Sequence, residues 1–284
     1  MLDRRSFNEG TWRHARPSPH AGAEPLPDLG QRERLVFKAI VHSYVLTAEP
    51  VGSRLVARRY RFGLSPATIR NVMMDLEEMR LLGQPHASAG RVPTDRGYRF
   101  YVDEILRPEG LARDEIDTID AFIGEAPAEP EVVLDRASMV LSALSALLAV
   151  AFHARSVEDR AGGDDRTYVD PIHFGGTGHI LTQPEFRTPE KLRALFEAIE
   201  TRGPLIDLVS GAAEPAEPGR VHIMIGTETA RPGMESISIV SSSYRGGGSE
   251  GYIGIIGPTR MRYPRMVSLV FYAARALSEK LDAA

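Results

Sequence analysis

Apolar positions in the first third of the chain recur at steps of three and four residues, in three successive segments. Because that spacing puts side chains on one helix face, it predicts helices over 31–47 and 53–60 and a third that starts at Pro66. Ser65 precedes the third helix as its N-cap, and proline fits the first helical position, where a missing N–H costs nothing. The expected buried positions are Leu35, Val36, Ala39, Ile40 and Tyr44 in the first helix, Leu55 and Val56 in the second, and Ile69, Val72, Met73, Leu76 and Met79 in the third.

A small hairpin is predicted after the third helix, with strands Leu82–His86 and Arg91–Thr94. Thr94 and Asp95 then open a further helix whose apolar residues are Tyr98, Tyr101, Val102 and Leu106. Three helices, a hairpin and another helix in this order are typical of a winged helix–turn–helix. We therefore predict a DNA-binding domain over residues 30–107.

The segments that flank this domain differ from it in pattern. Residues 1–29 are rich in proline and lack an apolar stretch, so we expect a disordered leader. Residues 108–130, with several prolines and glycines, predict a linker that holds one weak acidic helix. Residues 131–153 predict a strong helix with a nearly heptad seam, which suits either a domain core or a dimer interface. The seam consists of Ala137, Val140, Leu141, Leu144, Leu147, Leu148 and Ala151.

Helices and alternating strands fill the remainder, residues 131–284. Helices are predicted from Thr188 to Glu200 and from Pro264 to Leu281. Strands are predicted at Val221–Ile225, Ser236–Ser243 and Tyr252–Ile256. Antiparallel strands flanked by helices indicate an α+β fold class for the whole chain, with the winged helix first and a mixed domain after it.

Charge divides the chain in the same way. The net charge is −4 overall, yet residues 31–107 hold thirteen Arg or Lys and eight Asp or Glu, a net charge of +5. A basic module attached to an acidic body offers one end to a polyanion such as DNA. The absence of cysteine excludes disulfides and thiolate zinc sites. The longest apolar stretch, 137–152, is shorter than the roughly 20 residues needed to span a bilayer, so we expect a soluble, cytoplasmic protein with no membrane contact.

The outward face of the third helix carries the candidate chemistry. Its first turns present Thr68, Arg70 and Asn71, which are short or forked hydrogen-bonding groups. Arginine can bind guanine and asparagine can bind adenine through two hydrogen bonds in the major groove, whereas a solvated helix needs none of these groups. The candidate DNA-binding residues are Arg54, Ser65, Thr68, Arg70, Asn71, Arg91, Thr94 and Arg96, with Arg58 and Arg99 as further possible phosphate ligands.

Other motifs do not support catalysis or a cofactor. Residues Gly247–Gly251 match G-x-S-x-G, but glycines precede the serine and a predicted strand follows, so a hairpin loop is favoured over a nucleophile elbow. The GGTGH segment (175–179) lacks the lysine of a phosphate loop and suits a tight turn. Asp170, His173 and His179 are a weak alternative metal site, because their spacing matches no ligand pattern. We predict no catalytic residues, no metal and no cofactor.

Several long runs resemble one family. "EPVGSRLVARRY", "LSPATIRNVMMDLEEM" and "QPHASAGRVPTDRGYRFYVDEI" resemble the HrcA heat-inducible transcription repressors, as do "GGTGHILTQPEF" and "GIIGPTRMRYPRM" further on. The resemblance implies a dimeric repressor of chaperone operons that binds an inverted-repeat operator, is released on heat stress and is supported by a GroE-type chaperonin. It also implies a GAF-like dimerisation and regulatory domain over 131–284, with a dimerising insert. Here only residues 153–167 join Phe152 to Tyr168, so that insert is expected to be reduced or absent.

Two other function classes stay open from the residues alone. A winged-helix regulator could sense a small effector in its C-terminal domain, which would need an apolar pocket with converging polar groups. An enzyme that uses the winged helix only for interactions would need a cluster of titratable side chains, and the sequence offers no such cluster.

Overall fold

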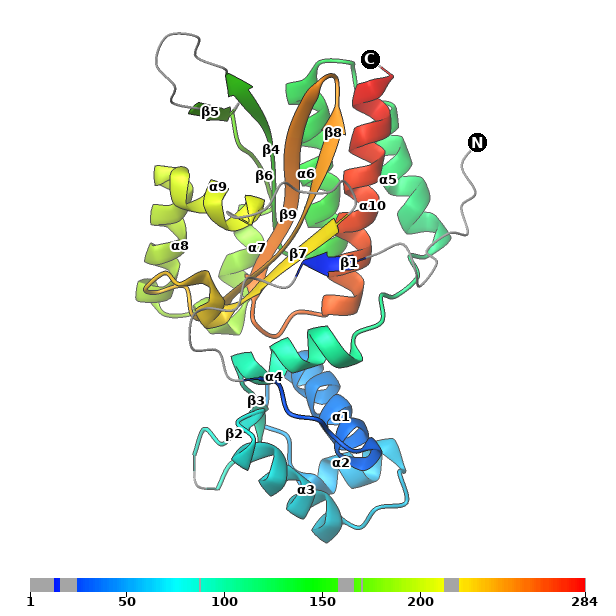
Figure 1. The fold of residues 1–284 in the computed structure, drawn as a ribbon, viewed down its shortest axis with the longest axis vertical. Helices are drawn as coiled ribbons and strands as arrows, with labels where there is room; N and C mark the ends of the chain where they lie inside the picture. The colour runs from blue at the N-terminus through cyan, green and yellow to red at the C-terminus, as the bar shows by residue number, and fades with distance from the viewer. Residues whose placement is uncertain are drawn as a thin grey trace. The chain divides into compact units, whose positions relative to one another are not determined.

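The computed structural model describes residues 13–15, 25–86, 88–157, 166–169, 171–211 and 220–283. These residues fall into two compact units (Figure 1). The helical unit takes its residues from Pro19–Leu106 and Thr259–Arg262. The sheet unit takes its residues from Met1–Ser18, Arg107–Pro258 and Tyr263–Ala284.

The helical unit has the predicted order of elements. Its helices are α1 (Gln31–Thr47), α2 (Ser53–Tyr60), α3 (Pro66–Glu78) and α4 (Asp95–Phe100), which continues as a π-helical turn over Tyr101–Ile105. The hairpin consists of β2 (Leu82–Gly83) and β3 (Val92–Pro93), in which Leu82 pairs with Pro93 and Gly83 with Val92. The hairpin strands are therefore shorter than expected, because Pro93 donates no hydrogen bond and residues 84–86 and 88–90 lie outside the ladder.

One apolar core holds the helical unit together. Val36, Phe37 and Ile40 of α1 are fully buried, and the rings of Phe37 and Phe100 meet edge to face at 5.6 Å. The stripe of α3 is buried at Ile69, Val72, Met73 and Leu76 as predicted, whereas Met79, the C-cap, is only half-buried. Leu35 and Leu55 differ from the prediction, since they are 43% and 42% exposed. Each lies one position away from the buried residues of its helix, where the stripe turns toward solvent.

Close backbone contacts fix the start of α4 against the end of α3. Thr94 is the N-cap of α4, and its hydroxyl oxygen accepts a hydrogen bond from the Gly97 amide at 3.0 Å. The same hydroxyl donates to the carbonyl of Arg80 at 2.6 Å. A side chain at Gly97 would overlap the carbonyl of Leu81, so only glycine permits this approach.

The sheet unit is built on a sheet in the order β1-β7-β8-β9-β4-β5, with β6 pairing with the other end of β4. The strands are β1 (Arg13–Ala15), β4 (Leu148–Val157), β5 (Arg166–Val169), β6 (His173–Gly175), β7 (Arg220–Ile225), β8 (Ile237–Gly246) and β9 (Ser249–Pro258). All described pairs are antiparallel except β1 with β7. The three strands predicted in this region are confirmed as β7, β8 and β9, and the α+β class is confirmed with them.

Helices cover both faces of this sheet (Figure 1). One layer contains α5 (Arg113–Gly124), α6 (Pro130–Ser145) and α10 (Tyr263–Asp282), and the other contains α7 (Thr177–Thr182), α8 (Pro189–Thr201) and α9 (Gly203–Ser210). Two 3-10 turns, Pro184–Phe186 and Gly226–Thr229, complete the described elements. Leu148, Val150 and Phe152 of β4 pack in the core with Leu195 of α8 and Leu205 of α9. The helix predictions at 188–200 and 264–281 are confirmed as α8 and α10.

The predicted helix over 131–153 is wrong beyond Ser145. Ala146 takes a left-handed conformation that ends α6, and the chain continues as β4 from Leu148. Residues 148–152 are fully buried on both faces of the sheet, and a strand of that kind has no alternation that would separate it from a buried helix. The apolar seam was thus the end of one helix joined to the start of a central strand.

Two segments expected to lie outside folded domains contain structure. Residues 13–15, placed in the leader, form β1 beside β7, whose backbone groups would otherwise stay open at the sheet edge. The acidic helix expected within 108–130 is α5, and its Ile119 and Ile123 are buried where it packs against α6 and α10, so this segment is part of the sheet unit.

The glycine-rich motifs serve packing and turns. A side chain at Gly175 or Gly176 would overlap Ser138 or Ser142 of α6, so the GGTGH segment lets this helix pack closely on β6. Gly247 and Gly248, with φ of 62° and 75°, form the turn of the β8–β9 hairpin. A strand therefore follows the serine of the G-x-S-x-G match, and the helix that a nucleophile elbow requires is not there.

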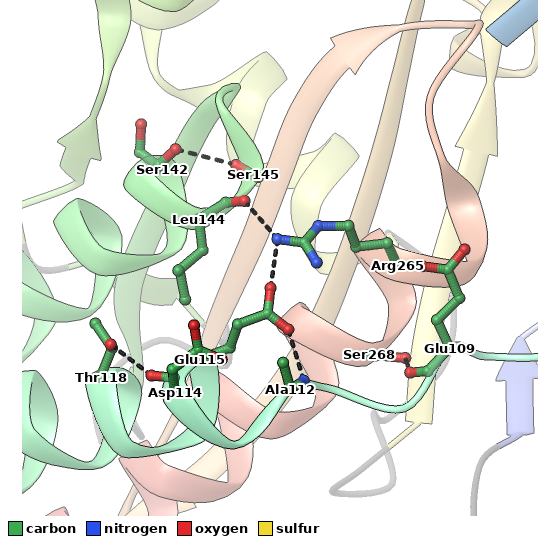
Figure 2. Close-up of polar contacts among 10 residues, drawn as sticks. All are labelled: Glu109, Ala112, Asp114, Glu115, Thr118, Ser142, Leu144, Ser145, Arg265 and Ser268. Atoms are coloured by element: carbon green, nitrogen blue, oxygen red, sulfur yellow. Dashed lines mark hydrogen bonds and ion pairs between the residues drawn. The ribbon is translucent and has the colours of Figure 1, made fainter. Parts of the chain in front are cut away.

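Arg265 joins the ends of three helices in the sheet unit (Figure 2). Its guanidinium is paired with the Glu115 carboxylate and donates to the carbonyl of Leu144 at 3.1 Å, at the last turn of α6. The Glu115 carboxylate also accepts from the Ala112 amide at the first turn of α5. Nearby, the Ser268 hydroxyl donates to the carbonyl of Glu109 at 2.6 Å.

Candidate nucleic-acid interface

The first turn of α3 is fixed by its own cap. The Ser65 hydroxyl oxygen accepts a hydrogen bond from the Thr68 amide at 3.1 Å, and Pro66 follows in the first helical position. The hydroxyls of Ser65 and Thr68 also lie 2.9 Å apart, within hydrogen-bonding distance. The positive end of the helix dipole thus lies at a capped helix start whose residues 65–67 are exposed, which suits an anion or a base edge.

Beyond the cap, α3 divides into a buried and an exposed face. Ile69, Val72, Met73 and Leu76 are buried, whereas Arg70 and Asn71 are exposed on consecutive positions. The exposed face continues with Met74, which is 49% exposed. Sequence reasoning listed the polar pair but overlooked Met74, although its place outside the buried stripe was readable from the helix period.

Basic side chains on α2 belong to the same helical unit. Arg54, Arg58 and Arg59 are all exposed, and α2 packs directly against α3. The C-terminal turn of α2 is tied to α1, because the Tyr60 hydroxyl lies 2.7 Å from Nδ1 of His42 and 3.1 Å from the Ser43 hydroxyl. These arginines therefore extend from a helix whose position is set by the core.

Arg91, predicted as a DNA contact, has a partner inside the unit. Its guanidinium lies 2.8 Å from the carboxylate of Glu77, and the arginine side chain is only 17% exposed. Its backbone also exchanges two hydrogen bonds of 2.9 Å with Val51. A side chain at the preceding Gly90 would overlap the backbone of Val51, so the base of the hairpin is packed tightly against the segment before α2.

The other predicted arginines of this region are engaged too. Arg96 donates to the carbonyl of Pro25 at 2.7 Å. Arg99 is paired with Asp103 at 3.2 Å, and these side chains are 11% and 4% exposed. Arg54, Arg70 and Asn71 are thus exposed and Thr68 is half-exposed. Ser65, Thr94, Arg91 and Arg96 instead make hydrogen bonds or ion pairs within the helical unit.

Acidic residues follow on α3 without entering its first turns. Asp75 and Glu78 are exposed, one and two turns after the Arg70–Asn71 pair. In the part of the chain that the structure describes, no group of three His, Cys, Asp or Glu side chains could hold a metal ion. Asp170 of the alternative metal site lies outside that part, and His173 instead has Nδ1 3.9 Å from Asp135. No described helix is long and apolar enough to cross a membrane.

A capped helix with an exposed polar face, next to a short hairpin and joined in one chain to an α+β unit, is an arrangement typical of DNA-binding transcription regulators. Comparison with known proteins gives the family. The chain is 32% identical to a heat-inducible transcription repressor HrcA of Chlorobium phaeobacteroides over 348 residues, covering 90% of this chain and 99% of the relative. It is 31% identical to the HrcA repressor of Geobacter sulfurreducens, covering 90% and 99% of the two chains.

The chain therefore belongs to the HrcA family of heat-inducible transcription repressors, which are DNA-binding regulators and not enzymes. The family model described as "HrcA protein C terminal domain" matches residues 154–267 of this chain. In fold, the chain is similar to a crystal structure described as that of a hypothetical protein, with a TM-score of 0.74 at 23% identity and coverage of 90% and 99%.

The alignment also shows that relatives are longer. Ninety per cent of 284 residues is about 256, against 348 aligned positions, so roughly 90 positions have no counterpart in this chain. A shortened chain was expected from the brief connection between Phe152 and Tyr168.

Proposed function

We propose that the helical unit is a winged helix–turn–helix that represses chaperone operons by binding an inverted-repeat operator. The observation that carries the proposal is the exposure of Arg70 and Asn71 directly after the Ser65 cap. An N-terminal helix end enters the major groove most easily, and these two side chains are suited to guanine and adenine.

The other candidate residues divide between contact and support. Thr68 is half-exposed and offers a hydroxyl to a base or phosphate, and Arg54 and Arg58 are placed to neutralise phosphates. Ser65 and Thr94 cap the two helices that flank the hairpin, and Arg96 ties α4 to the segment before α1. Arg91 acts on DNA through the position of the hairpin, because Glu77 already occupies its guanidinium.

Dimerisation is the second part of the proposal. A repressor that reads an inverted repeat presents two reading helices by two-fold symmetry, with half-sites about an integral number of helical turns apart. We assign dimerisation and regulation to a GAF-like domain within 131–284, with the inserted segment reduced. Heat would release the operator by depleting a folded state of limited stability, and a GroE-type chaperonin would restore it.

A mobility-shift titration of the full chain tests the proposal. The probes are promoter fragments of chaperone operons and a shuffled duplex of the same length and composition, each at several salt concentrations. We expect the promoter to bind at least about a thousandfold more tightly than the shuffled duplex, and both affinities to fall with salt. Equal affinity for the two probes would contradict sequence-specific repression.

A second measurement tests assembly. Light scattering of the complex after size-exclusion chromatography gives the number of chains on one promoter fragment. Two chains on a fragment with both half-sites, and weaker binding to a fragment with one half-site, are expected for a dimer. A single chain bound with full affinity would contradict the dimer and leave repression to a monomer.

A further inference from the structure

Met74 is the large apolar side chain on the exposed face of α3. Its side chain is 49% exposed, although the methionine directly before it, Met73, is buried. It lies seven residues after Ala67 and three after Asn71, which places all three on one stripe of the helix. Along this stripe the side chains are thus small at Ala67, polar at Asn71 and apolar at Met74, one turn later.

This position falls within the reach of the groove. With a rise of about 1.5 Å per residue, Met74 lies about 4.5 Å further along α3 than Asn71. A major groove about 12 Å wide accommodates both positions when the helix enters by its N-terminus. Glu78 continues the same stripe but lies one further turn away, where the helix leaves the groove.

The chemistry of the groove selects what Met74 can recognise. The C5-methyl group of thymine is the one apolar substituent that the bases present in the major groove, where the other distinguishing groups donate or accept hydrogen bonds. Methionine has no charge and no strong hydrogen-bonding group, and its unbranched thioether adapts to an apolar partner. We infer that Met74 contacts a thymine methyl group and adds specificity for A·T at one position of each half-site.

This inference rests on the proposed operator binding, and the experiment separates the two. Promoter duplexes are prepared in which single thymines are replaced by uracil, which removes only the methyl group. The wild-type chain, Met74→Ala and Met139→Ala are titrated against each duplex and against the shuffled duplex. Met139 is a matched control, since it is 51% exposed on α6 of the sheet unit.

For the wild type, uracil in place of the contacted thymine of one half-site should weaken binding about fourfold, the value of one buried methyl group. Met74→Ala should weaken binding to the thymine promoter by at least about fourfold and should lose the penalty for uracil at that position. Met139→Ala should behave as the wild type. Because both methionines are exposed, the unfolding midpoints of the two variants should match that of the wild type.

Two results would overturn the inference while leaving operator binding intact. One is a wild type that discriminates promoter from shuffled DNA but tolerates uracil at every position. The other is a uracil penalty that persists unchanged in Met74→Ala, because another residue would then contact the methyl group. Failure of the wild type to prefer the promoter would instead contradict the proposed function itself.

Discussion

The guanidinium of Arg91 and the carboxylate of Glu77 lie 2.8 Å apart, which ties the base of the hairpin to the last turns of α3. The arginine is the more buried partner, with 17% of its side chain exposed against 35% for the glutamate. The ion pair therefore couples the position of the hairpin to that of α3. To bind a DNA phosphate, Arg91 would first have to break its ion pair with Glu77.

The pair gives a test that distinguishes support from contact. Glu77→Gln removes the partner and frees the guanidinium, whereas Arg91→Ala removes the guanidinium. If Arg91 positions the hairpin, both variants should weaken binding to promoter and shuffled DNA, and a double-mutant cycle in unfolding should give a coupling of about 0.5–1 kcal/mol. If Arg91 is a phosphate ligand, Glu77→Gln should bind as well as the wild type or better, and only Arg91→Ala should shallow the salt slope by about one unit.

Gly90 should be intolerant of a side chain for the same reason. A Cβ atom there would overlap the backbone of Val51, so Gly90→Ala must displace the hairpin base or the segment before α2. We expect a loss of about 1–3 kcal/mol in the free energy of unfolding, measured by urea denaturation. Gly110→Ala is the matched control, because nothing lies within 4 Å of that position. Equal stability of the two variants would show that the hairpin base is loosely packed.

The helical unit was predictable because its signals are local. Fourteen consecutive residues contain the Ser65 cap, Pro66 and the buried stripe of α3, and the observed helix starts where these signals predict it. The sheet unit was less predictable, since β4 is a strand only because β9 and β6 pair with it from distant positions. A buried apolar run such as 147–152 carries no periodicity that distinguishes the two outcomes.

The candidate site shows the same division between local and non-local signals. The outward place of Arg70 and Asn71 follows from the helix period alone. The partner of Arg91 comes from an element fourteen residues earlier, and the carbonyl that Arg96 binds belongs to Pro25. Positive charge favoured DNA contacts both for Arg91 in the hairpin and for Arg96 at the start of α4, and charge does not reveal a partner that the fold supplies.

Arg265 should be a stability determinant of the sheet unit. Arg265→Ala would remove the links to Glu115 and to the Leu144 carbonyl, and would leave a carboxylate that is 11% exposed without its cation. The expected cost is about 1–3 kcal/mol in the free energy of unfolding of the full chain. Arg275→Ala is the control on the same helix, since its pair with Glu279 is exposed and should contribute less than about 1 kcal/mol. Similar losses in both variants would contradict the role given to Arg265.

The exposed polar face of α3 gives the sharpest prediction. Arg70→Ala and Asn71→Ala should each cost about 1–3 kcal/mol on the promoter and much less on shuffled DNA, because contacts to base edges exist only in the specific complex. Asp75→Asn and Glu78→Gln are exposed neighbours on the same helix and serve as controls. Removing their negative charge should raise affinity for both duplexes alike, through the phosphates.

The measurement is a set of binding isotherms for the four variants on both duplexes across salt. Base contacts change the ratio of the two affinities and leave the salt slope nearly unchanged, whereas phosphate contacts change the slope and preserve the ratio. Should Arg70→Ala and Asn71→Ala lose affinity equally on both duplexes, α3 would be an anchor for the DNA backbone. Sequence would then have to be read by Met74 or by another element, because the other polar side chains at the start of α3, Ser65 and Thr68, form its cap.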